Sequence, residues 1–185
     1  MDLLNKNNKC VLFIVSHEDF RDEEYFITRE MIENSGINIV TASSDKSPAK
    51  GTKGGEIAVD KLFSEISPDD YDGVVVVGGR GIRAYFKNTE LQELLKGFFN
   101  AGRVIGAICA APVLLAEAGL LRGKKCTAWH TEEDMEYPNV LIGSGAVFVD
   151  TDIVVDGRIV TAKSPEYAKK FGEAVASLII NESRP

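Results

Sequence analysis

One cysteine of this sequence lies where a nucleophile would be presented to solvent. The apolar segment 103–108 predicts a buried strand, and the alanine-rich segment 112–118, which is followed by a glycine, predicts a helix. Cys109 falls between them, and the residues two positions away on either side, Ala107 and Ala111, are small. A sharp strand-to-helix turn needs small residues there, and the following helix directs its N–H groups toward the sulfur. The pattern indicates a nucleophile, although a small buried core cysteine explains these residues equally well.

Three other groups that could take part in chemistry also follow predicted buried strands. In an open parallel sheet, ligands bind outside the carboxyl ends of the strands. We therefore expect a thiol, a carboxylate, an imidazole and a glycine-rich turn to meet at one edge of the sheet. The three groups are His17 with the acidic segment 19–24 after strand 10–16, Gly78-Gly79 after strand 73–77, and His130 after strand 126–129.

The elements that must position these groups alternate between strand and helix. Segment 19–34 predicts a helix between strands 10–16 and 37–42, and such a βαβ unit implies a parallel sheet. Further helices are predicted over 88–101 and 164–180. Because no repeat or linker interrupts the chain, we predict a single domain over residues 9–182. The predicted fold is a three-layer α/β sandwich with a mostly parallel central sheet.

Composition excludes several classes of function. The 185 residues carry a net charge of −7 without a basic cluster, which argues against nucleic-acid or anionic-membrane partners. Three cysteines without framework spacing and only two histidines argue against a metal site and against a disulfide scaffold. We therefore expect that the protein has no cofactor, and that its thiols are reduced in the cytoplasm. We also expect neither a signal peptide nor a membrane span.

Three motifs together resemble the ThiJ/PfpI superfamily. They are Phe20-Arg21-Asp22-Glu23-Glu24 ahead of Gly36, Val77-Gly78-Gly79-Arg80-Gly81, and Gly106-Ala107-Ile108-Cys109-Ala110-Ala111-Pro112. This superfamily includes the intracellular protease PfpI, the Parkinsonism-associated deglycase and glyoxalase III-type enzymes. The resemblance extends over nearly the whole chain and implies the class I glutamine amidotransferase-like, flavodoxin-like fold.

The resemblance assigns roles to four residues. It makes Cys109 the nucleophile, and Glu24 the acid that hydrogen-bonds its sulfur. The N–H groups of Gly79 and Ala110 would form the oxyanion pocket. Because an ionised carboxylate opposes a neighbouring thiolate, Glu24 helps only when it is protonated. We therefore expect a raised pKa for Glu24 and a lowered pKa for Cys109. Without the resemblance, Glu24 would be interpreted as a first-turn acid that favours the helix dipole.

Two departures from the superfamily pattern limit the chemistry. The protease-type members carry histidine directly after the cysteine, where this chain has Ala110, and segment 163–166 lacks the histidine of the amidotransferases. The deglycase-like arrangement takes its histidine from the next strand end, which assigns the base to His130. In that branch an acid at the position of Glu30 reaches the partner subunit's histidine.

Two further polar residues keep open roles at this stage. His17 matches no functional position of the superfamily, and we assign it to the rim or to an interface. Arg80 could hold a substrate carboxylate or make a surface salt bridge.

The resemblance favours cofactor-independent chemistry on small reactive carbonyls. We expect a glyoxalase- or deglycase-like enzyme of the stress response, acting on 2-oxoaldehydes as a homodimer or larger homo-oligomer. One alternative is a redox-sensing or chaperone-like stress protein in which Cys109 is oxidised. A second alternative is a PfpI-type cysteine peptidase or amidase, against which Ala110 counts.

Overall fold

A seven-stranded sheet forms the centre of the protein in a computed structural model that describes residues 9–181. Its strand order is β11-β12-β8-β7-β1-β3-β6, and every neighbouring pair is parallel except β11 with β12. The strands are β1 (Cys10–Ile14), β3 (Asn38–Ser43), β6 (Lys61–Leu62), β7 (Gly73–Val76), β8 (Val104–Ile108), β11 (Ile153–Asp156) and β12 (Ile159–Ala162). The last residue of the predicted domain, Glu182, lies outside the described residues.

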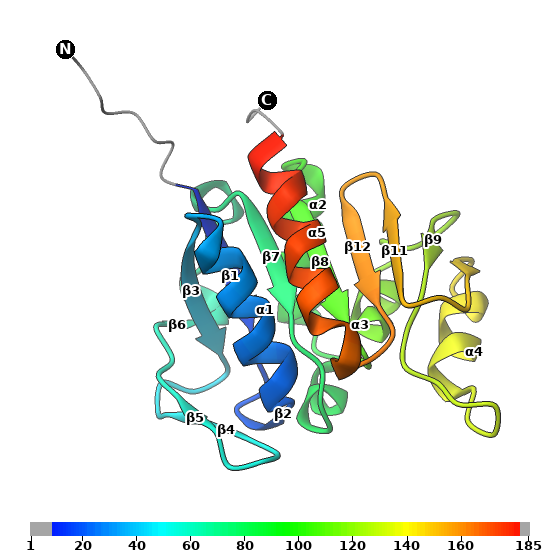
Figure 1. The fold of residues 1–185 in the computed structure, drawn as a ribbon, viewed down its shortest axis with the longest axis horizontal. Coiled ribbons are helices and arrows are strands. Elements are labelled where there is room, and N and C mark those ends of the chain that lie inside the picture. The colour runs from blue at the N-terminus through cyan, green and yellow to red at the C-terminus, as the bar shows by residue number, and fades with distance from the viewer. Residues whose placement is uncertain (1–8, 182–185) are drawn as a thin grey trace.

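Helices cover both faces of this sheet and complete the three layers that the sequence predicts. Figure 1 shows α1 (Asp22–Asn34) and α5 (Ala168–Asn181) side by side on one face. The helices α2 (Thr89–Asn100) and α3 (Pro112–Glu117) lie on the other face, and α4 (Glu136–Gly143) packs against α3. The predicted fold class is confirmed.

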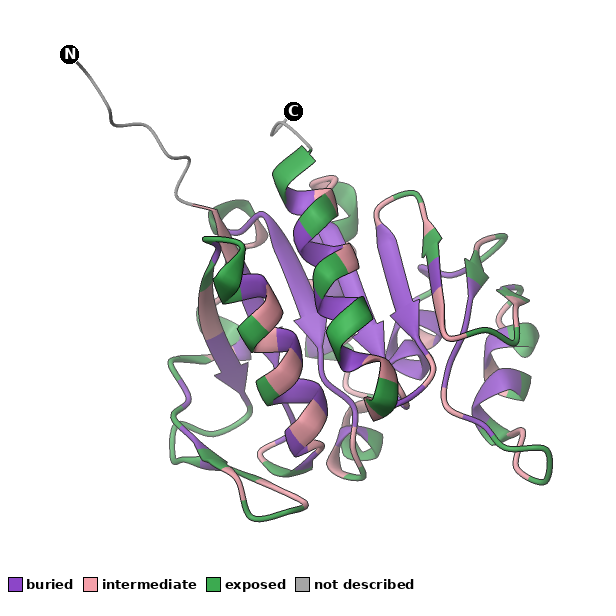
Figure 2. Ribbon diagram, in the orientation of Figure 1, coloured by how far each residue is buried: buried purple, intermediate pink, exposed green. Residues whose placement is uncertain are grey.

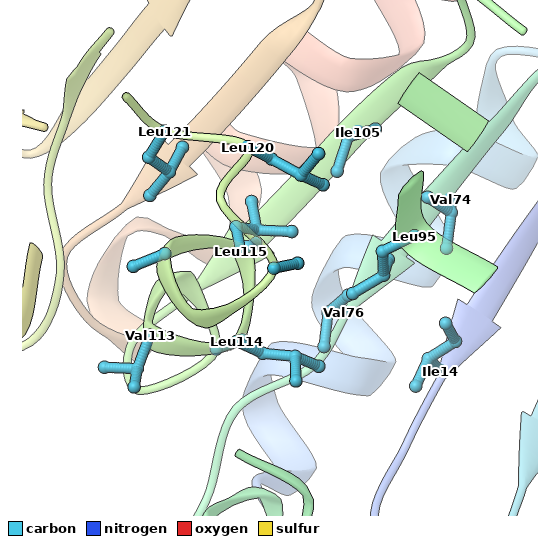
Figure 3. Packing of buried hydrophobic residues seen from close by; sticks show 14 of the residues in the cluster. Ile14, Val74, Val76, Leu95, Ile105, Val113, Leu114, Leu115, Leu120 and Leu121 are labelled. Atoms are coloured by element: carbon cyan, nitrogen blue, oxygen red, sulfur yellow. The ribbon is translucent and has the colours of Figure 1, made fainter. Parts of the chain in front are cut away.

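Burial on both faces explains why the central strands are continuous apolar runs. Every residue of β7 and β8 is buried, and Figure 2 shows these strands buried along their length while the helices alternate between buried and exposed positions. On the α2 and α3 face, Leu95 and Leu114 lie over the sheet with Val76 (Figure 3). Such an apolar interior provides most of the driving force for folding.

Short irregular elements follow the strands at the carboxyl edge of the sheet. The segment 43–55 contains β4 (Ala49–Gly51), which pairs with β5 (Glu56–Ile57) and with β2 (Glu18–Phe20). Because β2 takes up residues 18–20, the first helix starts at Asp22 and not at the predicted Asp19. Short 3₁₀ turns include η3 (Gly81–Tyr85) and η4 (Pro165–Tyr167), with η1 (Phe63–Glu65) and η2 (Pro68–Asp70) elsewhere.

The predicted strand 126–129 is wrong in extent. The structure has only β9 (Lys125–Cys126), paired with β10 (Val147–Phe148) outside the main sheet. The strand stops because the N–H of Thr127 donates to the Thr161 hydroxyl, at 2.9 Å, and not to a strand carbonyl. His130 therefore follows a loop and not a strand end. Among the helices described, none is both long and apolar enough to cross a bilayer.

Candidate active site

Cys109 occupies the sharp turn between β8 and α3. Its φ of +63° is in the left-handed region, which few residues other than glycine adopt, so the backbone here is strained. Two backbone hydrogen bonds stabilise this strained conformation. The N–H of Cys109 donates to Ala162 O and the N–H of Trp129 donates to Cys109 O, both at 2.9 Å. The turn fixes the thiol at the carboxyl edge of the sheet, as the sequence pattern predicts.

Two backbone N–H groups point at the sulfur. Burial raises the pKa of the Cys109 thiol, and the N–H groups of Gly79 and Ala110, which both hydrogen-bond to its side chain, oppose this rise. Gly79 has a φ of +110°, and a Cβ at this position would lie 2.5 Å from Asp19 O, so only glycine fits. The two donors are fixed by the backbone and lie beside the atom on which an adduct would form. They can stabilise an oxyanion there.

Glu24 reaches the same sulfur from the first turn of α1. Its side chain is completely buried, and Oε2 accepts the Gly78 N–H at 2.8 Å. The carboxyl also hydrogen-bonds to Cys109, and burial raises the pKa of Glu24 to about 8. A neutral carboxylic acid therefore faces the thiol at neutral pH. The prediction of a raised pKa for Glu24 is confirmed.

The predicted lowering of the Cys109 pKa is wrong. Burial raises the pKa of the thiol well above its ordinary value, and the charge of Glu24 and its hydrogen bond raise it further. The N–H groups of Ala110 and Gly79 act in the opposite direction but do not outweigh burial. The two acids share a dry site in which two negative charges would repel each other. Cys109 is thus a thiol beside a potential base, and not a preformed thiolate.

Gly78 makes the contact between Glu24 and Cys109 possible. A Cβ on Gly78 would lie 2.6 Å from Glu24 Oε2, 2.7 Å from Ile108 O and 3.0 Å from Cys109 Cβ. The residue therefore supplies both a hydrogen bond to the acid and the space that the acid occupies. Sequence reasoning assigned only the second glycine of the pair a role. The doubled glycine after a buried strand was the available signal for both.

A cavity of about 640 Å³ opens over Cys109. Residues from six separate segments line it, which is typical of a site at the carboxyl ends of parallel strands. One wall carries the aromatic side chains of Trp129 and Tyr137, and the others are mostly polar. The lining residues are Arg21, Thr52, Lys53, Gly79, Arg80, Arg83, Cys109, Ala110, Trp129, Asp134, Tyr137, Ser164, Pro165 and Glu166.

The structure does not bring His130 into this cavity. Its Nδ1 lies 2.9 Å from Ala128 O and its Nε2 lies 3.0 Å from Asp150 Oδ1, so both ring nitrogens are engaged away from Cys109. The preceding residue, Trp129, lines the cavity in its place. The side chain that faces the cavity is thus that of residue 129, one position before the predicted His130. Because successive side chains of extended chain point in opposite directions, a shift of one residue turns the side chain away.

Arg83 and Tyr137 form a second polar pair in the cavity wall. Arg83 Nη1 donates to the Tyr137 hydroxyl at 2.9 Å, and Arg83 Nη2 pairs with Glu136 Oε1 at 2.8 Å. Tyr137 is buried, and burial raises the pKa of its phenol. Sequence reasoning missed this pair because its residues are separated by more than fifty positions and neither belongs to a recognised motif.

The cations of the cavity differ in how they are paired. Arg21 and Lys53 both pair with Glu23, whereas Arg80 makes no ion pair with any residue in the described part of the chain. The surface salt bridge considered for Arg80 is therefore not formed. Arg80 lies directly after Gly79 with an exposed side chain, so its charge is available to a bound anion.

His17 and Glu30 lie away from the sulfur. His17 Nε2 is 3.3 Å from the Ser47 hydroxyl and 3.9 Å from Glu18 Oε1, on the loop side of the sheet edge. Glu30 is exposed on α1. The structure therefore assembles Cys109, Glu24, Gly79 and Ala110 around one atom, and leaves His130, His17 and Glu30 outside this group.

Comparison with known proteins supports the relationship that the motifs indicate. The model of the DJ-1/PfpI family matches residues 9–178. An uncharacterized protein from Methanocaldococcus jannaschii is 42% identical over 176 residues, covering 95% of this chain and 84% of the relative. The deglycase PfpI of Pyrococcus furiosus is 31% identical over 156 residues, covering 84% of this chain and 90% of the relative.

A named glyoxalase and a solved structure extend this comparison. The glutathione-independent glyoxalase DJR-1.2 of Caenorhabditis elegans is 28% identical over 163 residues, covering 88% of this chain and 84% of the relative. The crystal structure of a ThiJ/PfpI domain protein from Brachyspira murdochii superposes with a TM-score of 0.89 at 30% identity, covering 95% of this chain and 99% of that one.

Proposed function

The chain belongs to the DJ-1/PfpI family, and from this membership we propose that it converts small 2-oxoaldehydes into 2-hydroxy acids without a cofactor. The observation that supports the proposal most directly is the contact between the Cys109 thiol and a buried carboxyl group whose pKa is raised to about 8. Relatives of this chain are named deglycases and a glyoxalase. The cavity over the thiol is large enough for such small carbonyl compounds.

The first step is addition of the thiol to the aldehyde carbon C1. Glu24, in its ionised form, accepts the thiol proton while the sulfur bonds to C1 and the carbonyl electrons move to the aldehyde oxygen. The N–H groups of Gly79 and Ala110 stabilise the developing charge. The oxyanion then takes the proton from Glu24, which leaves a hemithioacetal and restores the carboxylate.

The second step moves hydrogen between the two carbons. Glu24 removes the proton from C1, and an enediol forms when the ketone oxygen on C2 gains a proton. Return of the proton from Glu24 to C2, with loss of the proton on the C1 oxygen, gives a thioester of Cys109. Water then cleaves the thioester, which releases the 2-hydroxy acid and the free thiol. C1 is oxidised and C2 is reduced, so no external oxidant or reductant is needed.

The raised pKa of Glu24 suits it to this work. A carboxylate with an ordinary pKa near 4.5 is a weak base, whereas a pKa of about 8 makes Glu24 a proton acceptor close to the operating pH. The same property lets its neutral form return the proton. Removal of early glycation adducts by hydrolysis would use the same thiol, acid and N–H donors.

The peptidase alternative has less support in this site. Peptide hydrolysis needs an acid that protonates the leaving amine, and in the PfpI-type enzymes the histidine after the cysteine does so. Here Ala110 occupies that position, and no imidazole among the described residues lines the cavity. Cysteine oxidation is likewise disfavoured by the raised pKa of Cys109, because the thiolate is the form that oxidants attack.

We also propose a cytoplasmic homodimer for the working protein. The structure shows no disulfide among the described residues, which suits a reducing compartment. Glu30 projects from the exposed side of α1, where it is available to a second copy, and Phe26 on the same helix is 44% exposed. Sedimentation of the wild type and of Phe26→Asp tests this assembly. A wild type that sediments as a monomer contradicts it.

Conversion of methylglyoxal to lactate tests the activity directly. We expect Cys109→Ser to lose all measurable turnover and Glu24→Gln to lose roughly 100-fold or more. Cys126→Ser is the matched control, because Cys126 is fully buried in β9 and does not line the cavity. Equal rates for the wild type and Cys109→Ser would refute the proposed function.

A further inference from the structure

We propose that Tyr137 is a catalytic residue that donates a proton to the ketone oxygen of the substrate and later recovers one from the C1 oxygen. This proposal rests on the proposed function, because it assigns a donor to the enediol step. The reaction needs such a donor at C2, while Glu24 is occupied with the carbon-bound hydrogen. Of the described residues that line the cavity with Cys109, none is a histidine.

The hydrogen bond from Arg83 determines what the Tyr137 hydroxyl can do. Arg83 Nη1 is a donor and lies 2.9 Å from the Tyr137 oxygen, so this oxygen is the acceptor. The phenolic proton must therefore point elsewhere, and it has no acceptor among the residues described. Since Tyr137 lines the cavity, a substrate oxygen is the acceptor that this proton lacks.

The donor is also held in a fixed position. The Tyr137 ring packs edge-on against Trp129 and Phe86, with centroids 6.1 Å apart in both cases, and only 7% of the residue is exposed. Arg83 stacks over the ring at 5.5 Å and is itself anchored by Glu136. A proton donor held on both sides loses little conformational freedom when substrate binds.

The cation beside the hydroxyl favours the transfer. The Arg83 charge stabilises the phenolate that forms when Tyr137 gives up its proton, and so opposes the effect of burial on the pKa of Tyr137. Cys109 and Tyr137 line the same cavity. Tyr137 of α4 and Cys109 of the turn after β8 therefore both face a substrate bound in the cavity.

The protons balance through the enediol step. Glu24 takes the C1 proton while Tyr137 protonates the C2 oxygen, which gives the enediol and a phenolate. When the C1 carbonyl forms again, the proton leaves the C1 oxygen for the phenolate, and Glu24 protonates C2. Tyr137 and Glu24 both return to their starting states, and the C2 oxygen keeps the donated proton as the product hydroxyl.

Tyr137→Phe isolates this function because it removes one oxygen and keeps the ring. We expect kcat for methylglyoxal to fall roughly 100-fold, in the range found for general acids. The rate of Cys109 alkylation by iodoacetamide should remain within about twofold of the wild type, because the thiol and Glu24 are untouched. A purely structural role for Tyr137 would slow alkylation and turnover together.

Tyr71→Phe is the matched control. Tyr71 is another buried tyrosine, but it precedes β7 at the opposite edge of the sheet and does not line the cavity. Its kcat should equal that of the wild type. Arg83→Met provides a second test if Tyr137→Phe folds poorly, since it keeps the hydroxyl but removes the group that orients it. We expect about a tenfold lower kcat with unchanged alkylation.

The outcomes separate this proposal from the proposed function. Turnover by the wild type together with equal turnover by Tyr137→Phe would overturn the role of Tyr137 and leave the proposed function intact. A parallel loss of alkylation and turnover in Tyr137→Phe would also overturn it. If the wild type forms no lactate, the proposed function fails, and the role of Tyr137 in it fails as well.

Discussion

The thiol of Cys109 and the carboxyl of Glu24 behave as one acid–base unit. Burial raises the pKa of both groups, and each charge disfavours the other, so the pair loses its first proton near the pKa of Glu24 and its second far above it. The reactive form is the pair with a single proton, whichever atom carries it. Reactivity at Cys109 is therefore controlled by an acid on another element.

The alkylation rate of Cys109 should report this coupling. In the wild type we expect the rate with iodoacetamide to rise about tenfold per pH unit below pH 8 and to level off above it, because Glu24 ionises with a pKa of about 8. Glu24→Gln should lack the inflection near pH 8. Mass spectrometry of the Cys109 peptide measures the rate without interference from Cys10. An unchanged inflection in Glu24→Gln would show that another group controls the thiol.

Gly78→Ala should separate the two groups. The added methyl would lie 2.6 Å from Glu24 Oε2, so we expect the carboxyl to move and turnover to fall roughly 100-fold. Overpacking of this kind costs about 1–3 kcal/mol of stability. Gly143→Ala, at a helical site with no atom within 4 Å of the new methyl, should leave turnover unchanged and should not lower stability. Wild-type turnover in Gly78→Ala would contradict the close contact.

The sequence was informative about residues whose role depends on local pattern. Cys109 lies between a predicted strand and a predicted helix, and the resemblance to the superfamily located Glu24 and Gly79. The aromatic pair of the cavity could not be predicted, because Trp129 and Tyr137 reach the site only through a loop that leaves β9 early. The lowered pKa expected for Cys109 was wrong because local sequence does not show how deeply a thiol is buried.

At the scale of elements, the loop 51–55 is held in place by Asp22 at the start of α1. Asp22 accepts the N–H groups of Lys53 and Gly55 at 2.8 and 2.7 Å. A Cβ on Gly51 or Gly55 would lie 2.4 Å from Asp22 Oδ1, which explains two glycines in a short loop. The loop contributes Lys53 to the cavity, so a first-turn acid of α1 positions a wall of the site.

Asp22→Ala should loosen this wall. We expect hydrogen exchange at the amides of Lys53 and Gly55 to accelerate, and stability to fall by about 1–3 kcal/mol, because two backbone donors lose a charged acceptor. Asp45→Ala is the control, since Asp45 bonds only within its own exposed turn. Unchanged exchange in Asp22→Ala would show that the loop is held by its strand pairing alone.

Elements with strong periodicity could be predicted, and short ones could not. The buried strands β1, β7 and β8 follow from unbroken apolar runs, and α2 follows from its apolar stripe. The length of β9 was overestimated because the backbone N–H of Thr127 donates to the side chain of Thr161, which is distant in the sequence but adjacent in the fold. Such a long-range bond leaves no trace in a local pattern, and it decides which side chain of 129–130 faces the cavity.

At the scale of the whole molecule, the buried acid makes folding stability depend on pH. Glu24 has a higher pKa in the folded chain, about 8, than its ordinary value of 4.5. Below pH 4.5 both states keep the proton and stability is unaffected. Between pH 4.5 and 8 only the folded state keeps it, so the free energy of unfolding falls by about 1.4 kcal/mol per pH unit. Above pH 8 the loss is complete.

Denaturant unfolding of Glu24→Gln should show the difference. We expect the variant to gain stability relative to the wild type between pH 5 and 8, because an amide carries no charge to bury. Glu23→Gln should instead be less stable than the wild type near neutral pH, and this difference in the free energy of unfolding should shrink as the pH falls. Burial raises the pKa of Glu23, but its bonds to Lys53 and charge from Arg21 outweigh burial and lower it, so its contribution is lost as pH falls. A difference in the free energy of unfolding between Glu24→Gln and the wild type that is constant with pH would contradict a buried ionisable Glu24.

The strand order has a consequence for how the protein acquires its activity during synthesis. Glu24 follows β1, whereas Cys109 follows β8 and is held by Ala162 of β12, which is synthesised after every other strand of the described sheet. A nascent chain that ends before Cys109 therefore carries the acid without the thiol, and one that ends before β12 lacks the carbonyl that holds the Cys109 turn. Turnover measured in a refolding mixture would therefore come only from molecules in which β12 has paired with β8. Recovery of activity would thus measure how many molecules have completed the sheet.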